Sequence, residues 1–371
     1  MEQPSRPFRL LVILLLVLGQ GFCIGFGPPR LAARDMGSQP LSPQQVHQLV
    51  HLAPPHIEAA AALLLDAGSQ TILYEKNADE RRAPASTTKM MTALVALEHG
   101  NLDDRVVVQA DSLQQASFIG LSAGEQWTLE DLLYALLLPS DNAVAEVIAQ
   151  HIAGSEEAFV ALMNDQAARW GLKNTHFVNP HGLDAPGQYS TARDLAQIAL
   201  HGLEQPVFAQ IVGTREHQVG QRALKNLNQL LETYAGTQGV KTGTTDAAGE
   251  CLVSAVSRPE GQAICVVLGS SDRYRDSRLL LDFYFTNYRS VPLELGPQGF
   301  TRFRKADGQE AVLVLRERRQ ALLPRWELPW LQLLRITQEP EPGEGVGPVG
   351  SARFSVGSAV IAELPLYLSA P

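Results

Sequence analysis

The sequence has few cysteines and little positive charge, and each scarcity excludes a class of protein. Three cysteines occur in 371 residues, and Cys23 lies in the N-terminal segment, so they do not form the framework of a disulfide-rich domain. No spacing of cysteine and histidine matches a metal site. Lys and Arg number 30 against 39 Asp and Glu, and the net charge of −9 argues against a nucleic-acid partner. Cys251 and Cys265 lie in strand-like runs, where we expect buried small side chains, although a bridge between them stays possible.

The N-terminus carries the first distinctive stretch. Arg6 and Arg9 precede an apolar run from Leu10 to Val17, and such a pattern is typical of a secretory signal. A spanning helix needs about 20 mainly apolar residues, and this run is marginal for that length. We therefore predict a signal peptide or an uncleaved membrane anchor over residues 1–33. Either alternative places the remaining chain outside the membrane: on its extracytoplasmic face, in a periplasm or in a cell wall.

The rest of the chain divides by texture into three parts. Residues 34–55 are rich in Pro, Gln and His and lack periodicity, so we predict a linker. Residues 56–290 contain a short hairpin, a helical block and a return to strands with a closing helix from Leu279 to Tyr288, which predicts an α+β domain with a mixed sheet. Residues 291–371 consist of short apolar runs between Gly and Pro turns, which predicts a small all-β domain.

Three short motifs stand in order in the α+β region. They are Ser86-Thr87-Thr88-Lys89, Ser140-Asp141-Asn142 and Lys241-Thr242-Gly243. Each motif alone is weak, because a lone serine is more often a helix cap and a lone lysine more often a solvated residue. Together the three motifs are a stronger indication, because each lies where one mechanism needs it: at a helix start, between two helices and on a strand.

The first motif predicts an activated nucleophile. A serine hydroxyl is weakly nucleophilic and needs a base within hydrogen-bonding distance. Residues three apart share a face of a helix, so Ser86 and Lys89 lie side by side. The N–H of Ser86 at the positive end of the helix suits an oxyanion. Burial and neighbouring cations lower a lysine pKa, which allows Lys89 to act as the base.

The other two motifs supply polar groups to the same cleft. Ser140 and Asn142 follow Pro139 on an expected loop, where Ser140 can relay a proton and Asn142 can orient Lys89 and the substrate amide. Lys241 and Thr242 lie on an expected edge strand, together with Thr244. We expect Lys241 to offer charge to a substrate carboxylate, and the N–H of Thr244 to be the second oxyanion donor.

At these residues the sequence resembles the serine D-Ala-D-Ala carboxypeptidases of peptidase family S11, the low-molecular-mass penicillin-binding proteins. The motif trio is shared by penicillin-binding proteins and class A β-lactamases. The resemblance covers roughly residues 56–290 and, more loosely, the tail. Three further stretches carry it: Pro84 to Ala93, Leu137 to Ala143 and Thr175 to Asp184.

The resemblance implies a transpeptidase/β-lactamase-like fold for the first domain and a set of roles. The enzyme would remove the terminal D-Ala from peptidoglycan pentapeptides, would need no cofactor, and would be inhibited covalently by β-lactams. The catalytic residues would be Ser86, Lys89 and Ser140, and the substrate-binding residues Asn142, Lys241, Thr242, Gly243 and Thr244. Arg273 would be a supporting arginine, with Arg275 and Arg278 as competitors for that place.

Other interpretations remain open. A class A β-lactamase needs an additional acid after the second motif, and the stretch Asn174 to Asp184 offers no Glu. A D,D-endopeptidase would use the same machinery, and a non-catalytic β-lactam or peptidoglycan sensor would bind without turnover. His176 and His181 belong to this stretch, and we interpret them as parts of a structural loop.

Overall fold

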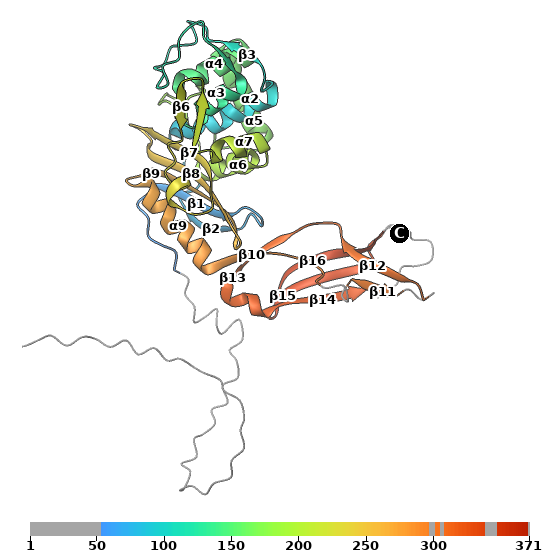
Figure 1. Cartoon of the computed structure of the whole chain (residues 1–371). Coiled ribbons are helices and arrows are strands. Elements are labelled where there is room, and N and C mark those ends of the chain that lie inside the picture. Colours follow the sequence, from blue (N-terminus) through green and yellow to red (C-terminus); the bar gives the residue numbers. More distant parts are fainter. Residues whose placement is uncertain (1–52, 297–300, 305–307, 338–346, 370–371) are drawn as a thin grey trace, which may run out of the picture. The chain divides into compact units, whose positions relative to one another are not determined.

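The computed structural model describes residues 53–296, 301–304, 308–337 and 347–369 (Figure 1). The predicted leader over residues 1–33, most of the predicted linker and most of the turn-rich stretch that begins at Gln338 lie outside these ranges. Across the described ranges, no helix combines the length and the apolar character that a membrane span requires.

A five-stranded sheet forms the centre of the α+β region. Its order is β2-β1-β9-β8-β7, so β7 is an edge strand, as the sequence predicts. The pairs within this sheet are antiparallel, which corrects the expected mixed sheet. The physical reason is that short turns join β7 to β8 and β8 to β9, and such turns connect antiparallel neighbours. The bounds are β1 Ala61–Asp66, β2 Ile72–Lys76, β7 Thr237–Thr245, β8 Gly249–Arg258 and β9 Gly261–Ser270.

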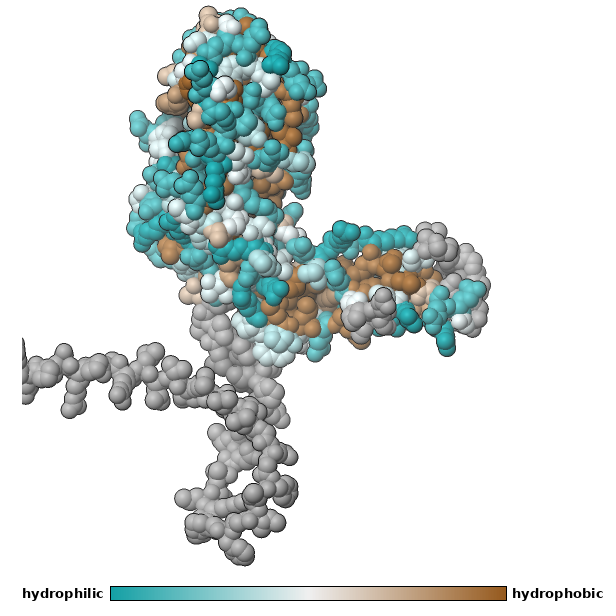
Figure 2. Space-filling model, viewed as in Figure 1, coloured by the Kyte–Doolittle hydropathy of each residue, from teal (hydrophilic) through white to brown (hydrophobic). Residues whose placement is uncertain are grey.

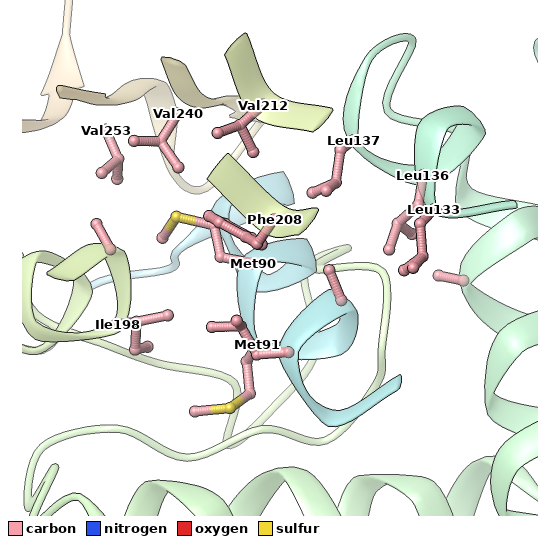
Figure 3. Packing of buried hydrophobic residues seen from close by; sticks show 14 of the residues in the cluster. Met90, Met91, Leu133, Leu136, Leu137, Ile198, Phe208, Val212, Val240 and Val253 are labelled. Carbon is pink, nitrogen blue, oxygen red and sulfur yellow. The ribbon is translucent and has the colours of Figure 1, made fainter. Parts of the chain in front are cut away.

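The two faces of this sheet are buried by different helices. On β8, Cys251 and Val253 belong to the larger apolar cluster with the helical block, whereas Leu252 and Val256 belong to a second cluster with α9. This alternation is what a strand covered on both sides requires. Figure 3 shows the larger cluster, in which Met90 and Phe208 lie near Val240 and Val253.

The helices follow the predicted periodicity and are capped by polar side chains. Thr128 Oγ1 accepts from the N–H of Asp131 at the start of α3, and Asp141 caps α4 in the same way. The last helix, α9, begins at Arg273 rather than at Leu279 as expected, because Asp272 accepts from two N–H groups there. The bounds are α2 Lys89–His99, α3 Leu129–Leu137, α4 Asn142–Ala153, α5 Glu156–Arg169, α6 Ala192–Leu203, α7 Pro206–Gly213, α8 Leu230–Thr233 and α9 Arg273–Asn287.

Two small hairpins extend the helical block, and sequence periodicity had not indicated them. Strand β3 (Arg105–Val107) pairs with β4 (Gln126–Thr128), and β5 (Glu216–Val219) pairs with β6 (Arg222–Lys225). The long connection between β3 and β4, residues 108–125, reaches the cleft described below. We call residues 117–121 of this connection the Phe118 segment.

The C-terminal part is built of strands, in agreement with the sequence. A second five-stranded sheet has the order β11-β12-β16-β15-β14 and encloses its own apolar cluster. Strand β10 pairs with β13, and the predicted boundary at residues 290–291 falls within β10. Figure 2 shows apolar residues gathered over this part of the chain. The bounds are β10 Tyr288–Pro292, β11 Arg302–Arg304, β12 Glu310–Leu315, β13 Gln320–Pro324, β14 Leu331–Thr337, β15 Gly350–Val356 and β16 Ala359–Leu368.

Cys251 and Cys265 are buried and unpaired with each other, so the bridge that the sequence left possible does not form. Cys251 lies opposite Gly243 on β7, and Cys265 lies opposite Ser254 on β8. Both side chains belong to the apolar clusters and serve as small core residues.

Candidate active site

The first motif forms a tight turn that leads into a helix. Residues Ala85–Thr88 form a 3₁₀ helix, and α2 begins directly afterwards at Lys89. Ala85 has a φ of 49°, a conformation that non-glycine residues adopt rarely. The turn brings Ser86 Oγ to 2.9 Å from Lys89 Nζ, as the spacing of three predicts. Ser86 lines the cleft, so its hydroxyl is accessible to a substrate.

Lys89 is buried completely, with an exposed fraction of 0%. Besides Ser86, its Nζ contacts Asn142 Oδ1 at 2.7 Å and the carbonyl oxygen of His181 at 2.6 Å. Burial is the main cause that lowers the pKa of Lys89 well below its ordinary value. The positive charge of Lys241 lowers it further, while the carboxylate of Asp141 raises it.

These three partners fit a neutral amine. A neutral lysine amine has two N–H donors and one lone pair. The carbonyl oxygens of Asn142 and His181 can only accept, so they take the two N–H groups. In that state the lone pair faces Ser86 Oγ, 2.9 Å away, and the hydroxyl can donate its proton; when Lys89 is protonated, its Nζ donates to Ser86 Oγ instead. The arrangement is that of a base in contact with its nucleophile.

The second motif spans the start of α4. Asn142 is the first residue of that helix, which corrects the expectation that it lies on a loop together with Ser140. The reason is that Asp141 acts as the N-cap, so the helix begins one residue after Ser140. Ser140 itself has a φ of 64° and is 8% exposed. Within the part of the chain that the structure describes, its Oγ has no hydrogen-bond partner, which is uncommon for a buried hydroxyl outside functional sites.

The third motif lies on the edge strand β7, as predicted, but its lysine is hidden. Lys241 is 1% exposed, and its Nζ donates to the carbonyl oxygen of Thr242 at 3.1 Å. Burial and then the charge of Arg273 lower the pKa of Lys241 to about 7. Thr242 and Thr244 line the cleft. Lys241 is therefore buried beneath the cleft lining, and its positive charge lowers the pKa of Lys89.

Gly243 is required by the close approach of β7 to the nucleophile. A Cβ at this position would lie 2.9 Å from the N atom of Ser86 and 2.9 Å from the Cβ of Ala85. Real Cβ atoms do not approach other atoms so closely, so a side chain here would push the strand away from Ser86. The glycine thus keeps the third motif in contact with the first.

Arg273 is the arginine that reaches the cleft. Its Nη2 donates to Thr244 Oγ1 at 2.7 Å and its Nη1 to the carbonyl oxygen of Gly243 at 2.8 Å, while Nε pairs with Glu250. Arg275 instead pairs with Glu58, and Arg278 donates to Thr233. Of the three arginines, Arg273 is the one that lines the cleft, because it is the first residue of α9 and bonds to β7.

The two histidines occupy loop positions. His181 is buried, and its Nδ1 accepts from the N–H of Leu183 at 3.1 Å. Burial and the charge of Lys89 lower the pKa of His181 to about 4, so the imidazole is neutral at pH 7. His176 is exposed and stacks on Tyr189. The backbone of His181 contributes more than its ring, since its carbonyl oxygen is the third partner of Lys89.

The cleft between these elements has a volume of about 500 Å³. Its lining comes from the nucleophile turn, the second motif, β7 and α9, and also from the apolar residues Phe118, Leu183 and Leu227. Sequence reasoning missed the His181 carbonyl and the Phe118 segment, because neither belongs to a motif. Among the described ranges, no group of three potential ligands of the His, Cys, Asp or Glu type could hold a metal ion.

Comparisons with known proteins show which family the chain resembles. Residues 48–272 match the model of a family described as D-alanyl-D-alanine carboxypeptidase, Peptidase S11. The chain is 33% identical over 323 residues to the D-alanyl-D-alanine carboxypeptidase DacF of Bacillus subtilis, covering 83% of this chain and 78% of that protein. It is 32% identical over 377 residues to DacC of Escherichia coli, covering 95% and 90% respectively.

Solved structures are similar as well. Penicillin-binding protein 5 of Haemophilus influenzae has a TM-score of 0.72 and 29% identity, and the likeness covers 85% of this chain and 98% of that one. The DD-transpeptidase of Streptomyces K15 has a TM-score of 0.60 and 34% identity, over 63% of this chain and 99% of that one.

Proposed function

Because this chain belongs to the D-alanyl-D-alanine carboxypeptidase family of serine peptidases, we propose that it releases the terminal D-Ala of peptidoglycan stem peptides through an acyl-enzyme on Ser86. The observation that carries the proposal is the contact set of Lys89, whose buried Nζ is positioned to take the proton of Ser86.

Acylation begins when Ser86 Oγ attacks the carbonyl carbon of the penultimate D-Ala and Lys89 takes the hydroxyl proton. The N–H groups of Ser86 and Thr244 would stabilise the oxyanion of the tetrahedral intermediate. The C–N bond then breaks, and D-Ala leaves with a proton passed through Ser140, whose Oγ lacks a protein partner within the described residues. Water attacks the ester and regenerates Ser86.

Substrate binding would rest on the strand side of the cleft. The terminal carboxylate would bind near the hydroxyls of Thr242 and Thr244, with Arg273 supplying the positive charge that reaches the cleft. Lys241 would act from beneath the cleft lining, where it is buried. Its positive charge would favour the neutral form of Lys89. Asn142 would hold Lys89 and the substrate amide.

Penicillin would acylate Ser86 and leave slowly. A class A β-lactamase uses an additional acid to activate the deacylating water. In this chain, Asp184 accepts from Thr245 Oγ1 at 2.6 Å and from the N–H of Ala247 at 3.0 Å, so it connects two loops. This supports inhibition by β-lactams rather than their fast turnover.

The proposal extends to domains and location. Residues 56–290 would form the catalytic domain and residues 291–371 a separate β-domain. Residues 1–33 would be a signal or an anchor that exports the enzyme to the extracytoplasmic face of the membrane, where peptidoglycan is found. The apolar run after Arg6 and Arg9 is what supports export.

The first test is intact-mass spectrometry of the protein incubated with benzylpenicillin. We expect one stable adduct on the wild type and on Ser122→Ala, which alters an exposed serine, and none on Ser86→Ala. A D-Ala release assay on a D-Ala-D-Ala peptide would run alongside. Rapid penicillin turnover would instead indicate a β-lactamase, and an adduct without D-Ala release would indicate a sensor.

A further inference from the structure

The cleft contains an apolar side chain to which the reaction above assigns no role. Among the described residues, seven large hydrophobic side chains are exposed, and Phe118 at 72% is the most exposed of them. Single exposed apolar residues are ordinary on protein surfaces, so exposure alone has no functional meaning. Phe118 differs because it lines the same cleft as Ser86, Asn142 and Thr244.

The backbone on both sides of Phe118 is held by a buried carboxylate. Asp141 is 0% exposed, and its Oδ2 accepts from Ser117 Oγ at 2.9 Å and from the N–H of Ile119 at 3.0 Å. Ser117 Oγ in turn accepts from the N–H of Leu121 at 2.9 Å. The two neighbours of Phe118 therefore share one acceptor, which fixes the point from which the ring projects.

Arg222 makes a second set of contacts with the Phe118 segment. Arg222 on β6 donates from Nε to the carbonyl oxygen of Ile119 and from Nη2 to that of Gly120, each at 3.0 Å. Its guanidinium also pairs with Glu125. Farther along the same connection, Glu146 on α4 accepts from the N–H groups of Gln114 and Gln115. An aromatic ring on a backbone held in this way is preorganised for contact, so binding to it costs little ordering entropy.

The position of Asp141 ties this segment to the catalytic groups. Asp141 stands between Ser140 and Asn142 in the chain, and its Oδ1 also caps α4. Arg273, which marks the carboxylate end of the cleft, bonds instead to β7 and β8. The leaving D-Ala is small and belongs at that charged end. Of the apolar residues that line the cleft, Phe118, Leu183 and Leu227, Phe118 is the most exposed, which favours its ring for contact with the part of the peptide that becomes the acyl group.

We propose that Phe118 is a specificity-determining residue that packs against the aliphatic side chain of the residue preceding D-Ala-D-Ala, and that Asp141 is its positioning residue through Ser117. This inference rests on the acyl-enzyme function proposed above. It names the chemistry the cleft prefers in the acyl donor: a side chain with several methylene groups.

The test compares two tripeptides, diacetyl-L-lysyl-D-Ala-D-Ala and acetyl-glycyl-D-Ala-D-Ala, by kcat/KM for D-Ala release. In the wild type we expect the lysyl peptide to be preferred by about tenfold, the range that a few methylenes in an apolar contact provide. Phe118→Ala should remove most of that preference while leaving hydrolysis of the glycyl peptide within about twofold. Val107→Ala, which shortens an exposed apolar side chain outside the cleft lining, should keep the wild-type ratio.

The positioning role is tested by Ser117→Ala, which leaves the charge of Asp141 and the α4 cap in place. It should lower the same ratio, Ser117→Thr should restore it, and Ser117→Ala with Phe118→Ala should lose no more than Phe118→Ala alone.

A stable penicillin adduct on every variant shows that the nucleophile machinery is intact. If the wild type forms no adduct, the proposed function fails. The role of Phe118 is overturned if adducts form but Phe118→Ala keeps the preference for the lysyl peptide. It is also overturned if Phe118→Ala changes the preference for the leaving residue instead. If only Ser117→Ala keeps the preference, Asp141 does not position Phe118.

Discussion

The two walls of the cleft use positive charge in opposite ways. The helical wall comprises Ser86, Lys89, Ser140 and Asn142, and its lysine is completely buried, which lowers the pKa of that lysine. The strand wall comprises residues 241–244 together with Arg273, and here the guanidinium of Arg273 lines the cleft. Lys241 shares a feature with each wall, because it is buried like Lys89 but belongs to strand β7. The difference between the walls is one of exposure, because the cation beside Ser86 is buried whereas the cation beside Thr244 lines the cleft.

The largest effect should come from removing the base of the helical wall. Lys89→Met keeps the side-chain volume but removes the amine, and it should lower kcat by about 10³-fold, because no other group contacts Ser86 Oγ as a base within the described residues. Steady-state kinetics of D-Ala release would measure this, with Lys173→Met, an exposed lysine, as the control. Retention of activity within tenfold, in protein shown to be folded by thermal melting, would contradict the role of Lys89 as base.

The second prediction concerns stability and the buried lysine of the strand wall. The pKa of Lys241 is about 7 in the folded protein against an ordinary 10.5, so between these values the unfolded chain binds a proton that the folded protein does not. Stability due to this residue therefore rises with pH across that window, and below pH 7 the cost of the buried charge is present in full. Relative to Lys241→Met, the wild type should gain about 3 kcal/mol in unfolding free energy between pH 7 and pH 9.5.

Urea unfolding of both proteins at the two pH values would measure this difference. Lys241→Met should also lose activity while gaining stability at pH 7, because replacing a buried ion by an apolar side chain is often stabilising. Parallel pH dependences of the two proteins would show that Lys241 keeps its proton in the folded state, and burial would then not lower the pKa of Lys241.

The smallest effect should come from the cation that the cleft exposes. Arg273→Gln should raise KM for a D-Ala-D-Ala peptide by about 10- to 100-fold with a smaller change in kcat, since a charge-assisted contact to the carboxylate is lost. A peptide ending in an amide should show little further loss. Arg275→Gln serves as the matched control, because Arg275 pairs with Glu58. An equal loss for the acid and the amide peptide would show that Arg273 only supports the backbone of β7.

The chemistry of this protein was largely readable from local sequence. The spacing of three between Ser86 and Lys89 predicted their contact, and the structure has it at 2.9 Å. The apolar periodicity of the helices and the strand character of residues 239–244 predicted the elements that carry the motifs. These features depend on residues close in the chain, where helix and strand geometry alone decide which side chains share a face.

Only the tertiary structure decided which of these side chains are buried, which line the cleft and which partners they contact. The contact of Lys89 with the His181 carbonyl joins residues 92 positions apart, and the choice of Arg273 over Arg275 depends on which side of α9 meets β7. The burial of Lys241 and the hold of Asp141 on the Phe118 segment likewise arise from packing between distant elements. The sequence identifies the side chains. Packing against distant parts of the chain determines how exposed each side chain is, and therefore its pKa and its contacts.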